Sequence, residues 1–212
     1  MKHLIILGAR GCGREVLEWA KDINEVEHRW NRFSFLDHDK SVLDGKRCGA
    51  KIIGNEDDYV VKKEDEFVCA RGDGKIRKEL IEKMERKGAV FVNIIHPTAV
   101  VGDSVKIEGA AILYPNCIIS ADVNVGKGCI VNMNSVVAHD VTLGEFCTLS
   151  NNCDISGGCT IGNHLFMGVN AHIIPYTTVE DNVYICAGST VMTRVKANSK
   201  MIGNPAKRVK GW

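Results

Sequence analysis

The sequence predicts an α/β unit followed by an all-β solenoid, and two patterns carry this prediction. From residue 101 to residue 196 the chain divides into sixteen consecutive six-residue blocks, each of which begins with an aliphatic side chain. Residues 1–95 instead alternate short apolar runs with stretches of helical spacing. A six-residue unit is one short strand and a bend, and it buries its apolar side only against copies of itself. The uninterrupted repeat therefore predicts a parallel β-helix.

Three blocks form one triangular coil of eighteen residues, so side chains eighteen apart stack in columns about 4.8 Å apart. Five cysteines share the fifth position of their blocks, namely Cys117, Cys129, Cys147, Cys153 and Cys159. Two interpretations are open: the thiols pack as small hydrophobes at the corners, or Cys147, Cys153 and Cys159 bind a metal from three corners of one coil. Packing is favoured because valine, alanine and leucine, which cannot ligate, occupy the same position elsewhere.

In the N-terminal part, apolar runs predict strands at 2–7, 32–36, 66–70 and 89–95, and helical spacing predicts helices at 14–22 and 75–87. This alternation is typical of a small Rossmann-like parallel sheet with helices on its faces. His96-Pro97 marks a boundary, because the residue before a proline is pushed out of helical conformation. We therefore expect two domains, 1–95 and 96–212.

Charge and composition narrow the functional classes. A net charge of +1 argues against a nucleic-acid partner, and the sequence has no apolar run long enough to span a membrane. Nine cysteines, an odd number without a CxxC pair, favour reduced thiols and a cytoplasmic location. The spacing of histidines, cysteines and carboxylates does not suggest a metal site.

Several local motifs accompany the repeat. They are the loop Gly8-Ala9-Arg10-Gly11-Cys12-Gly13, Phe35-Leu36-Asp37, Arg71-Gly72-Asp73 before a helix with Arg77, His96-Pro97, the segment 132–140, Gly144-Glu145-Phe146, and the sequence GNPAKR at 203–208. Together with the repeat, these motifs resemble the hexapeptide-repeat acyltransferases. The greatest similarity is to the sialic-acid O-acetyltransferase-like family, which includes bacterial nucleotide-sugar N-acetyltransferases of the bacillosamine and perosamine type. The resemblance implies a left-handed β-helix, acetyl-CoA as donor, and a homotrimer with active sites between subunits.

Acyl transfer requires a base, and His139 is the best candidate. It lies at the third position of its block, where the side chain points outward, and the pKa of histidine is close to working pH. Asp140 follows directly and would orient the imidazole. The resemblance places the catalytic base and its acidic helper at these two positions, and it places Asn132 nearby. An exposed surface histidine and a structural asparagine ladder are the alternatives.

The donor site follows from the column arithmetic. Gly157 lies eighteen residues after His139 and leaves room for a thioester beside the base. The resemblance implies acetyl-CoA contacts at Thr148, Gly157, Val169 and Ala187. Thr148 departs from a histidine that occurs in the family, which puts that contact in doubt. Simple packing is the alternative for each glycine or alanine.

The acceptor site is expected in the N-terminal domain, because no loop interrupts the repeat to build one there. The glycine loop and the helix start after it present backbone N–H groups suited to a diphosphate. The resemblance implies nucleotide-sugar contacts at Arg10, Gly11, Cys12, Asp37, His38 and Gly72. Cys12 replaces a common family histidine. The loop lacks the full G-x-G-x-x-G fingerprint, so a purely structural turn is the alternative.

The leading hypothesis is an acetyl-CoA-dependent N-acetyltransferase acting on the amino group of a nucleotide-linked amino sugar for surface-glycan synthesis. The enzymatic alternative is O-acetylation of sialic acid or a related sugar. A non-catalytic trimer that binds a nucleotide-sugar is the alternative from another class. An NAD-dependent activity is disfavoured because the predicted sheet is too short for a full dinucleotide site.

Overall fold

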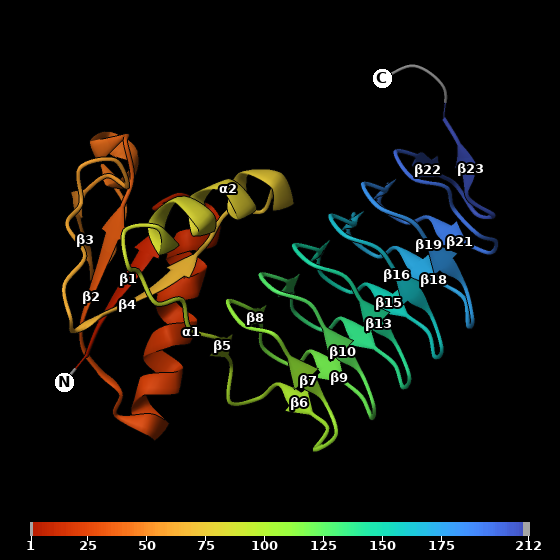
Figure 1. The fold of residues 1–212 in the computed structure, drawn as a ribbon, viewed down its shortest axis with the longest axis horizontal. Helices are drawn as coiled ribbons and strands as arrows, with labels where there is room; N and C mark the ends of the chain where they lie inside the picture. The colour runs from red at the N-terminus through yellow and green to blue at the C-terminus, as the bar shows by residue number, and fades with distance from the viewer. Residues whose placement is uncertain (1, 210–212) are drawn as a thin grey trace.

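The computed structural model describes residues 2–209 and contains an α/β domain beside a parallel β-helix (Figure 1). The N-terminal domain has a parallel four-stranded sheet of order β3-β2-β1-β4. Its strands are β1 (Lys2–Leu7), β2 (Trp30–Leu36), β3 (Lys51–Gly54) and β4 (Asp65–Cys69), with a short 3₁₀ helix, η1 (Lys40–Leu43), before β3. The predicted Rossmann-like topology is confirmed.

Two helices cover opposite faces of this sheet. Helix α1 (Gly11–Glu27) packs on the face that contains Leu4 and Ile6, and α2 (Gly74–Glu85) packs on the face that contains Ile5 and Leu7. Successive residues of β1 therefore alternate between two cores, which explains why the strand is apolar throughout.

The predicted strand at 89–95 is confirmed only in part. Phe91 makes a parallel bridge to Phe67 of β4, whereas β5 (Ile94–Ile95) pairs with β8 (Ile112–Leu113) of the β-helix. The fourth strand of the sheet is β3, which the sequence did not reveal because only four residues follow a long polar loop.

The buried ring of His3 gives the N-terminal domain a pH dependence. Its Nδ1 lies 3.0 Å from Asp65 Oδ1 and its Nε2 lies 2.9 Å from Ser34 Oγ, contacts that a neutral imidazole can make. Burial lowers the pKa of His3 below its usual value of 6.5, and the nearby Arg32 lowers it further, against the opposing effect of Asp65. The unfolded chain therefore binds this proton more tightly than the folded one.

We expect the free energy of unfolding to keep this contribution above pH 6.5 and to lose it as the pH falls through the lowered pKa of His3. Urea unfolding between pH 7.5 and pH 5 measures it. The His3→Gln variant keeps a donor but does not titrate, so its stability should decline less over this interval. Equal declines for the two proteins would contradict the expectation.

The β-helix has three faces, each a sheet of short strands that stack in parallel, apart from the last strand of the eight-stranded face. The five-stranded face consists of β7 (Lys106–Ile107), β10 (Asn124–Val125), β13 (Thr142–Leu143), β16 (Thr160–Ile161) and β19 (Thr178–Val179). The six-stranded face consists of β6 (Val100–Val101), β9 (Ile118–Ile119), β12 (Val136–Val137), β15 (Asp154–Ile155), β18 (His172–Ile173) and β21 (Thr190–Val191). The eight-stranded face consists of β5, β8 (Ile112–Leu113), β11 (Ile130–Val131), β14 (Thr148–Leu149), β17 (Phe166–Met167), β20 (Tyr184–Ile185), β22 (Lys200–Ile202) and β23 (Lys207–Arg208).

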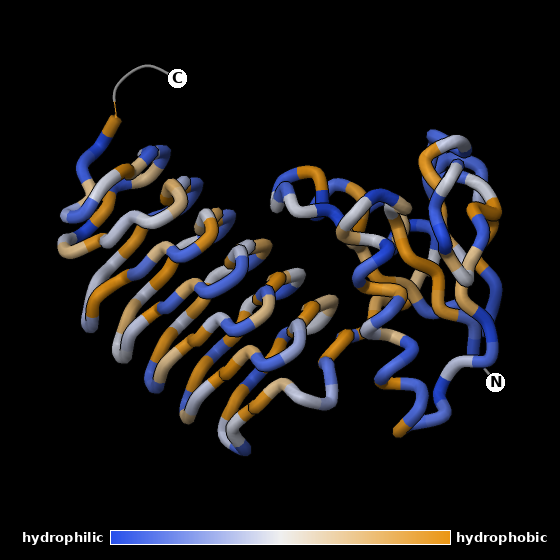
Figure 2. The backbone as a smooth tube through the Cα atoms, turned by 180° about the vertical axis from the view of Figure 1, so that it is seen from behind, coloured by the Kyte–Doolittle hydropathy of each residue, from blue (hydrophilic) through white to orange (hydrophobic). Residues whose placement is uncertain are grey.

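The predicted period of eighteen residues is confirmed by the strand register. Val131, for example, pairs with Leu113 below it and Leu149 above it, and all three are buried in the interior. Figure 2 shows hydrophobic segments recurring at corresponding places on successive coils. The last strands, β22 and β23, form an antiparallel hairpin at the end of the β-helix far from the N-terminal domain (Figure 1).

Backbone conformation at the corners follows the same period. Residues at the fourth position of the blocks, such as Asn116, Asp122, Asn134 and Asp140, have φ between 57° and 59°, the left-handed region that asparagine and aspartate tolerate best. The frequent glycines at the second position have another cause. A Cβ on Gly144 would lie 2.6 Å from the backbone of Gly162, so these glycines allow successive coils to approach closely.

The fifth-position cysteines are buried at the corners. The thiols of Cys129, Cys147, Cys153 and Cys159 each donate to a backbone carbonyl 3.1–3.2 Å away on the next coil. Burial raises the pKa of the Cys153 thiol to about 11, which keeps it protonated at neutral pH. Among residues 2–209, no three histidines, cysteines or carboxylates form a group that could hold a metal ion.

The N-terminal domain rests on the first coils of the eight-stranded face. Ile112, Tyr114 and Ile130 from that face share one core with α1 and β1. Helix α2 lies over the same face further along (Figure 1). Within the described residues, no helix is long and apolar enough to cross a membrane.

Candidate functional site

His139 and Asp140 form an exposed pair at the corner between β12 and β13. The Nδ1 of His139 lies 2.8 Å from Asp140 Oδ2, and the two side chains are 60% and 65% exposed. A carboxylate at Nδ1 requires the proton on that nitrogen, which leaves the lone pair of Nε2 free to accept another proton. The left-handed conformation of Asp140, with φ of 59°, belongs to the repeating corner geometry that holds the two side chains here.

Gly157 lies directly against the ring of His139. A Cβ built on this glycine would be 2.6 Å from both Cε1 and Nε2 of the imidazole, so only glycine leaves the ring in place. The column arithmetic that placed residue 157 above residue 139 therefore describes a real contact. The accessible nitrogen of the base faces a stretch of backbone with no side chain on it.

Asn132 makes a contact within the β-helix. Its Nδ2 donates to the carbonyl of Leu149, 2.6 Å away on the next coil. This bond satisfies a backbone carbonyl of the β-helix and occupies one donor of the amide. Placement of the acceptor by Asn132 remains a prediction.

The remaining donor-site residues lie on other parts of the surface. Val169 and Ala187 are exposed at the corner that joins the eight-stranded and six-stranded faces, whereas His139 and Gly157 lie at the next corner, between the six-stranded and five-stranded faces. A single chain thus places Val169 and Ala187 at a different corner from Gly157.

Thr148 is buried beneath the N-terminal domain. Its hydroxyl donates to the carbonyl of Gly72 at 2.8 Å and accepts from the guanidinium of Arg77 at 2.9 Å. With both roles filled, its predicted contact with acetyl-CoA remains a prediction that this geometry does not support. The side chain instead links the two domains.

The glycine loop is held by Asp37. One oxygen of this buried carboxylate accepts from the backbone N–H of Ala9 at 2.9 Å, and the other accepts from the N–H of Asp39 at 3.1 Å. Arg71 lies 3.5 Å from the same carboxylate. Asp37 therefore fixes the shape of the loop, and a direct contact with a nucleotide remains a prediction.

The other predicted acceptor residues surround this loop. Arg10 and Gly11 are exposed at the start of α1, and Gly72 is exposed after β4. The Sγ of Cys12 lies 3.2 Å from the hydroxyl of the buried Tyr114 on the β-helix. Nε2 of His38 contacts the carboxylates of Glu56 and Asp57 at 3.1 and 3.0 Å. Arg10, Gly11 and Gly72 follow the carboxyl ends of parallel strands, where ligands of such sheets bind.

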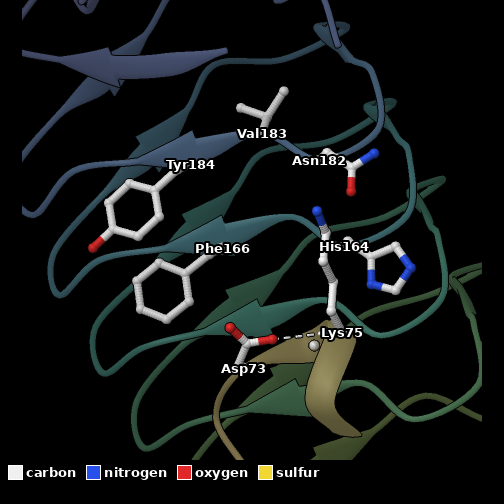
Figure 3. A pocket seen from close by; sticks show the side chains of 8 residues that line it. Asp73, Lys75, His164, Phe166, Asn182, Val183 and Tyr184 are labelled. Atoms are coloured by element: carbon white, nitrogen blue, oxygen red, sulfur yellow. Dashed lines mark hydrogen bonds between the residues drawn. The ribbon is translucent and has the colours of Figure 1, made fainter. Parts of the chain in front are cut away.

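An aromatic shelf, Phe166 with Tyr184, was not anticipated from the sequence. The two rings stack with centroids 4.7 Å apart, and Lys200 Nζ lies 4.9 Å from the centroid of Tyr184. The rings of Phe166 and Tyr184 line a hollow of about 350 Å³ beside Asp73 and Lys75 at the start of α2 (Figure 3). Two aromatics eighteen residues apart at an outward position were the available signal.

Residues 3–84 match the PglD N-terminal domain family. No curated protein matches the chain. Solved structures match along nearly its full length. PerB from Caulobacter crescentus, in complex with CoA and GDP-perosamine, is 28% identical with a TM-score of 0.89, covering 99% of this chain and 98% of the other.

The acetyltransferase domain of PglB from Neisseria gonorrhoeae, in complex with acetyl coenzyme A, is 26% identical with a TM-score of 0.89. The match covers 98% of this chain and 99% of that domain. WeeI from Acinetobacter baumannii, at 22% identity and a TM-score of 0.88, supports the fold alone.

Proposed function

We infer that this chain, a hexapeptide-repeat acetyltransferase with a PglD N-terminal domain, transfers the acetyl group of acetyl-CoA to the amino group of a nucleotide-linked amino sugar. The observation that carries the chemistry is the exposed His139–Asp140 pair, whose free nitrogen faces Gly157. The observation that carries the substrate class is the similarity to enzymes bound to CoA and to GDP-perosamine.

The amine attacks the thioester carbonyl, so a C–N bond forms as the C–S bond breaks. Nε2 of His139 takes the proton that the nitrogen loses, and the imidazolium then donates this proton to the departing sulfur of CoA. Asp140 holds the ring in the required tautomer and stabilises the imidazolium. A positioned base of this kind typically contributes about 10²- to 10⁴-fold to the rate.

The thioester is placed beside Gly157, because this glycine carries no side chain next to the ring of the base. The pantetheine arm follows the exposed corner of a second chain at Val169 and Ala187. The acceptor lies with its diphosphate at the glycine loop, near Arg10, Gly11 and Gly72.

The test is release of free CoA thiol from acetyl-CoA in the presence of a UDP-linked 4-amino sugar, with GDP-perosamine and free sialic acid as further acceptors. Release that needs both a nucleotide-linked amine and His139 supports the proposal. Release with sialic acid alone would indicate O-acetylation. Thermal stabilisation by a nucleotide-sugar without any release would indicate a binding protein.

We further propose that the chain forms a homotrimer through the six-stranded face. Val100, Ile118 and Val136 stack in register on the outside of that face, and the first two are 59% and 39% exposed. An apolar column of this kind on a soluble β-helix favours a protein partner. His139 follows β12 at the edge of the same face, so a second chain there would bring its own corner to the base.

Ile118→Asp should therefore dissociate the trimer and abolish acetyl transfer although His139 is unchanged. Light scattering coupled to gel filtration measures the mass of the assembly. Asn124→Asp adds the same charge to the five-stranded face and should leave both mass and activity unaltered. A wild-type monomer, or an Ile118→Asp trimer with normal activity, would refute this assembly.

We also propose a cytoplasmic location. All nine cysteines are unpaired, which fits a reducing compartment in which acetyl-CoA is available. Acetylation of a nucleotide-linked sugar takes place before the sugar is joined to a growing glycan.

A further inference from the structure

We propose that Arg77 and Thr148 act as positioning residues that fix the loop of Arg71, Gly72 and Asp73 above the β-helix, and so set where the acceptor sugar meets the donor. This inference rests on the proposed function for its kinetic consequence. Its structural part, the immobilisation of the loop, is independent of the reaction.

Arg77 projects from α2 into the junction of the two domains and is completely buried. All three of its nitrogens donate hydrogen bonds of 2.5–3.1 Å, and the acceptors come from both domains. These acceptors are the carbonyls of Arg71, Gly72, Gly128, Phe146 and Cys147 and the hydroxyl of Thr148. The planar fork of arginine reaches this many acceptors at fixed angles, whereas a lysine ammonium has only three donors.

No carboxylate within residues 2–209 forms an ion pair with Arg77. A buried charge without a counter-ion is costly, and here the dipoles of backbone carbonyls are the compensation. A residue needed only to fill the junction could be apolar at a lower cost. Because all three nitrogens of the Arg77 side chain donate hydrogen bonds, we infer that its role is to hold the acceptor carbonyls of the loop and of the β-helix in fixed positions.

Thr148 completes this geometry from the β-helix side. Its hydroxyl accepts from Arg77 and donates to the carbonyl of Gly72, so that one carbonyl receives bonds from both residues. Gly72 is an exposed glycine, with no atom near its Cβ position to restrain it by packing. The hydrogen bonds to its carbonyl are therefore its principal restraint.

The loop lies between the glycine loop and the hollow lined by the aromatic shelf. On one side Arg71 contacts Asp37, which holds the glycine loop. On the other side Asp73 caps α2 and borders the hollow with the aromatic shelf. Displacing Gly72 would move a predicted acceptor contact while leaving the corner of His139 untouched. The expected signature is a higher KM for the acceptor with an unchanged KM for acetyl-CoA.

The experiment compares wild type, Thr148→Val and Arg77→Lys by steady-state kinetics and by hydrogen–deuterium exchange of peptides covering residues 70–76. Thr148→Val removes the hydroxyl at nearly constant shape, and we expect it to raise the acceptor KM about three- to tenfold. Arg77→Lys should raise it more than tenfold. Both should speed exchange in the loop. If Arg77→Lys does not fold, Thr148→Val alone decides the matter.

Lys127→Met is the matched control. Lys127 also joins the two domains, through an ion pair of 2.7 Å with Glu85 at the far end of α2, but it does not contact the loop. The Lys127→Met variant should leave loop exchange and the acceptor KM unchanged. If Thr148→Val speeds loop exchange but the wild type shows no acetyl transfer, the fixing of the loop by Arg77 and Thr148 would be supported and the proposed function refuted. Unchanged loop exchange in Thr148→Val, or a rise in the KM for acetyl-CoA alone, would overturn the proposal that these two residues position the loop.

Discussion

Replacing His139 with alanine should lower kcat by about 10²- to 10⁴-fold, because the reaction then lacks its base. Folding should be little affected, since the side chain is mostly exposed and lies against Asp140 and the backbone at Gly157. Binding of acetyl-CoA should also persist, because no predicted donor contact depends on the imidazole. Initial rates of thiol release, together with calorimetric titration of CoA, measure the two effects separately.

A histidine elsewhere provides the control for this variant. His28 is exposed at the end of α1 in a left-handed conformation that asparagine tolerates, so His28→Asn should retain full activity. Asp140→Asn keeps the shape of its side chain but removes the charge that stabilises the imidazolium, and should give an intermediate loss. Normal turnover in His139→Ala would remove this residue from the mechanism.

Replacing Gly13 with alanine should lower the free energy of unfolding by about 3 kcal/mol or more, at the upper end of the cost of overpacking. The added Cβ would lie only 1.9 Å from the carbonyl oxygen of Gly8, which is backbone and cannot rotate away. Helix α1 would have to separate from the end of β1, and the glycine loop would lose its shape. Urea unfolding followed by the fluorescence of Trp19 and Trp30 reports on this domain.

Gly11→Ala is the matched control, because it lies in the same loop and first helical turn but has no heavy atom within 4 Å of its Cβ position. Its stability should stay within about 0.5 kcal/mol of wild type, as for other surface substitutions. Equal stability of the two variants would mean that the close contact between Gly8 and Gly13 is not what shapes the loop.

The β-helix was predictable because its signal is repeated sixteen times, so a single unusual block does not obscure the period. Strand β3 and the segment 89–95, only part of which forms a strand, show the opposite case. Each is a short apolar segment without repetition, and pairing partners far along the chain decide its structure. Ile94 pairs with Ile112 of the β-helix, a preference that composition alone does not express.

The candidate site divides in the same way. The contact of His139 with Gly157 follows from counting eighteen residues, and the aromatic shelf of Phe166 and Tyr184 would have followed from the same count. The hydrogen bonds of Arg77 at the junction of the two domains could not have been predicted by such a count. The acceptors of Arg77 in the β-helix lie 51 to 71 residues further along the chain, and carbonyl oxygens have no sequence signature. Likewise, the sequence indicated Asp37 as a ligand contact, but it did not reveal that the carboxylate accepts a hydrogen bond from the backbone N–H of Ala9, 28 residues away.

The fixed register also limits how the length of this protein can change. An insertion of one residue that is not extruded as a loop would turn the side chains that follow it between inside and outside, and an insertion of six would move every later column to the neighbouring face. Only a whole coil of eighteen residues restores each column to its own face. Descendants of this chain can therefore lengthen the β-helix after Ala187 in steps of one coil, which leaves the contact between His139 and Gly157 and the other proposed donor positions unchanged.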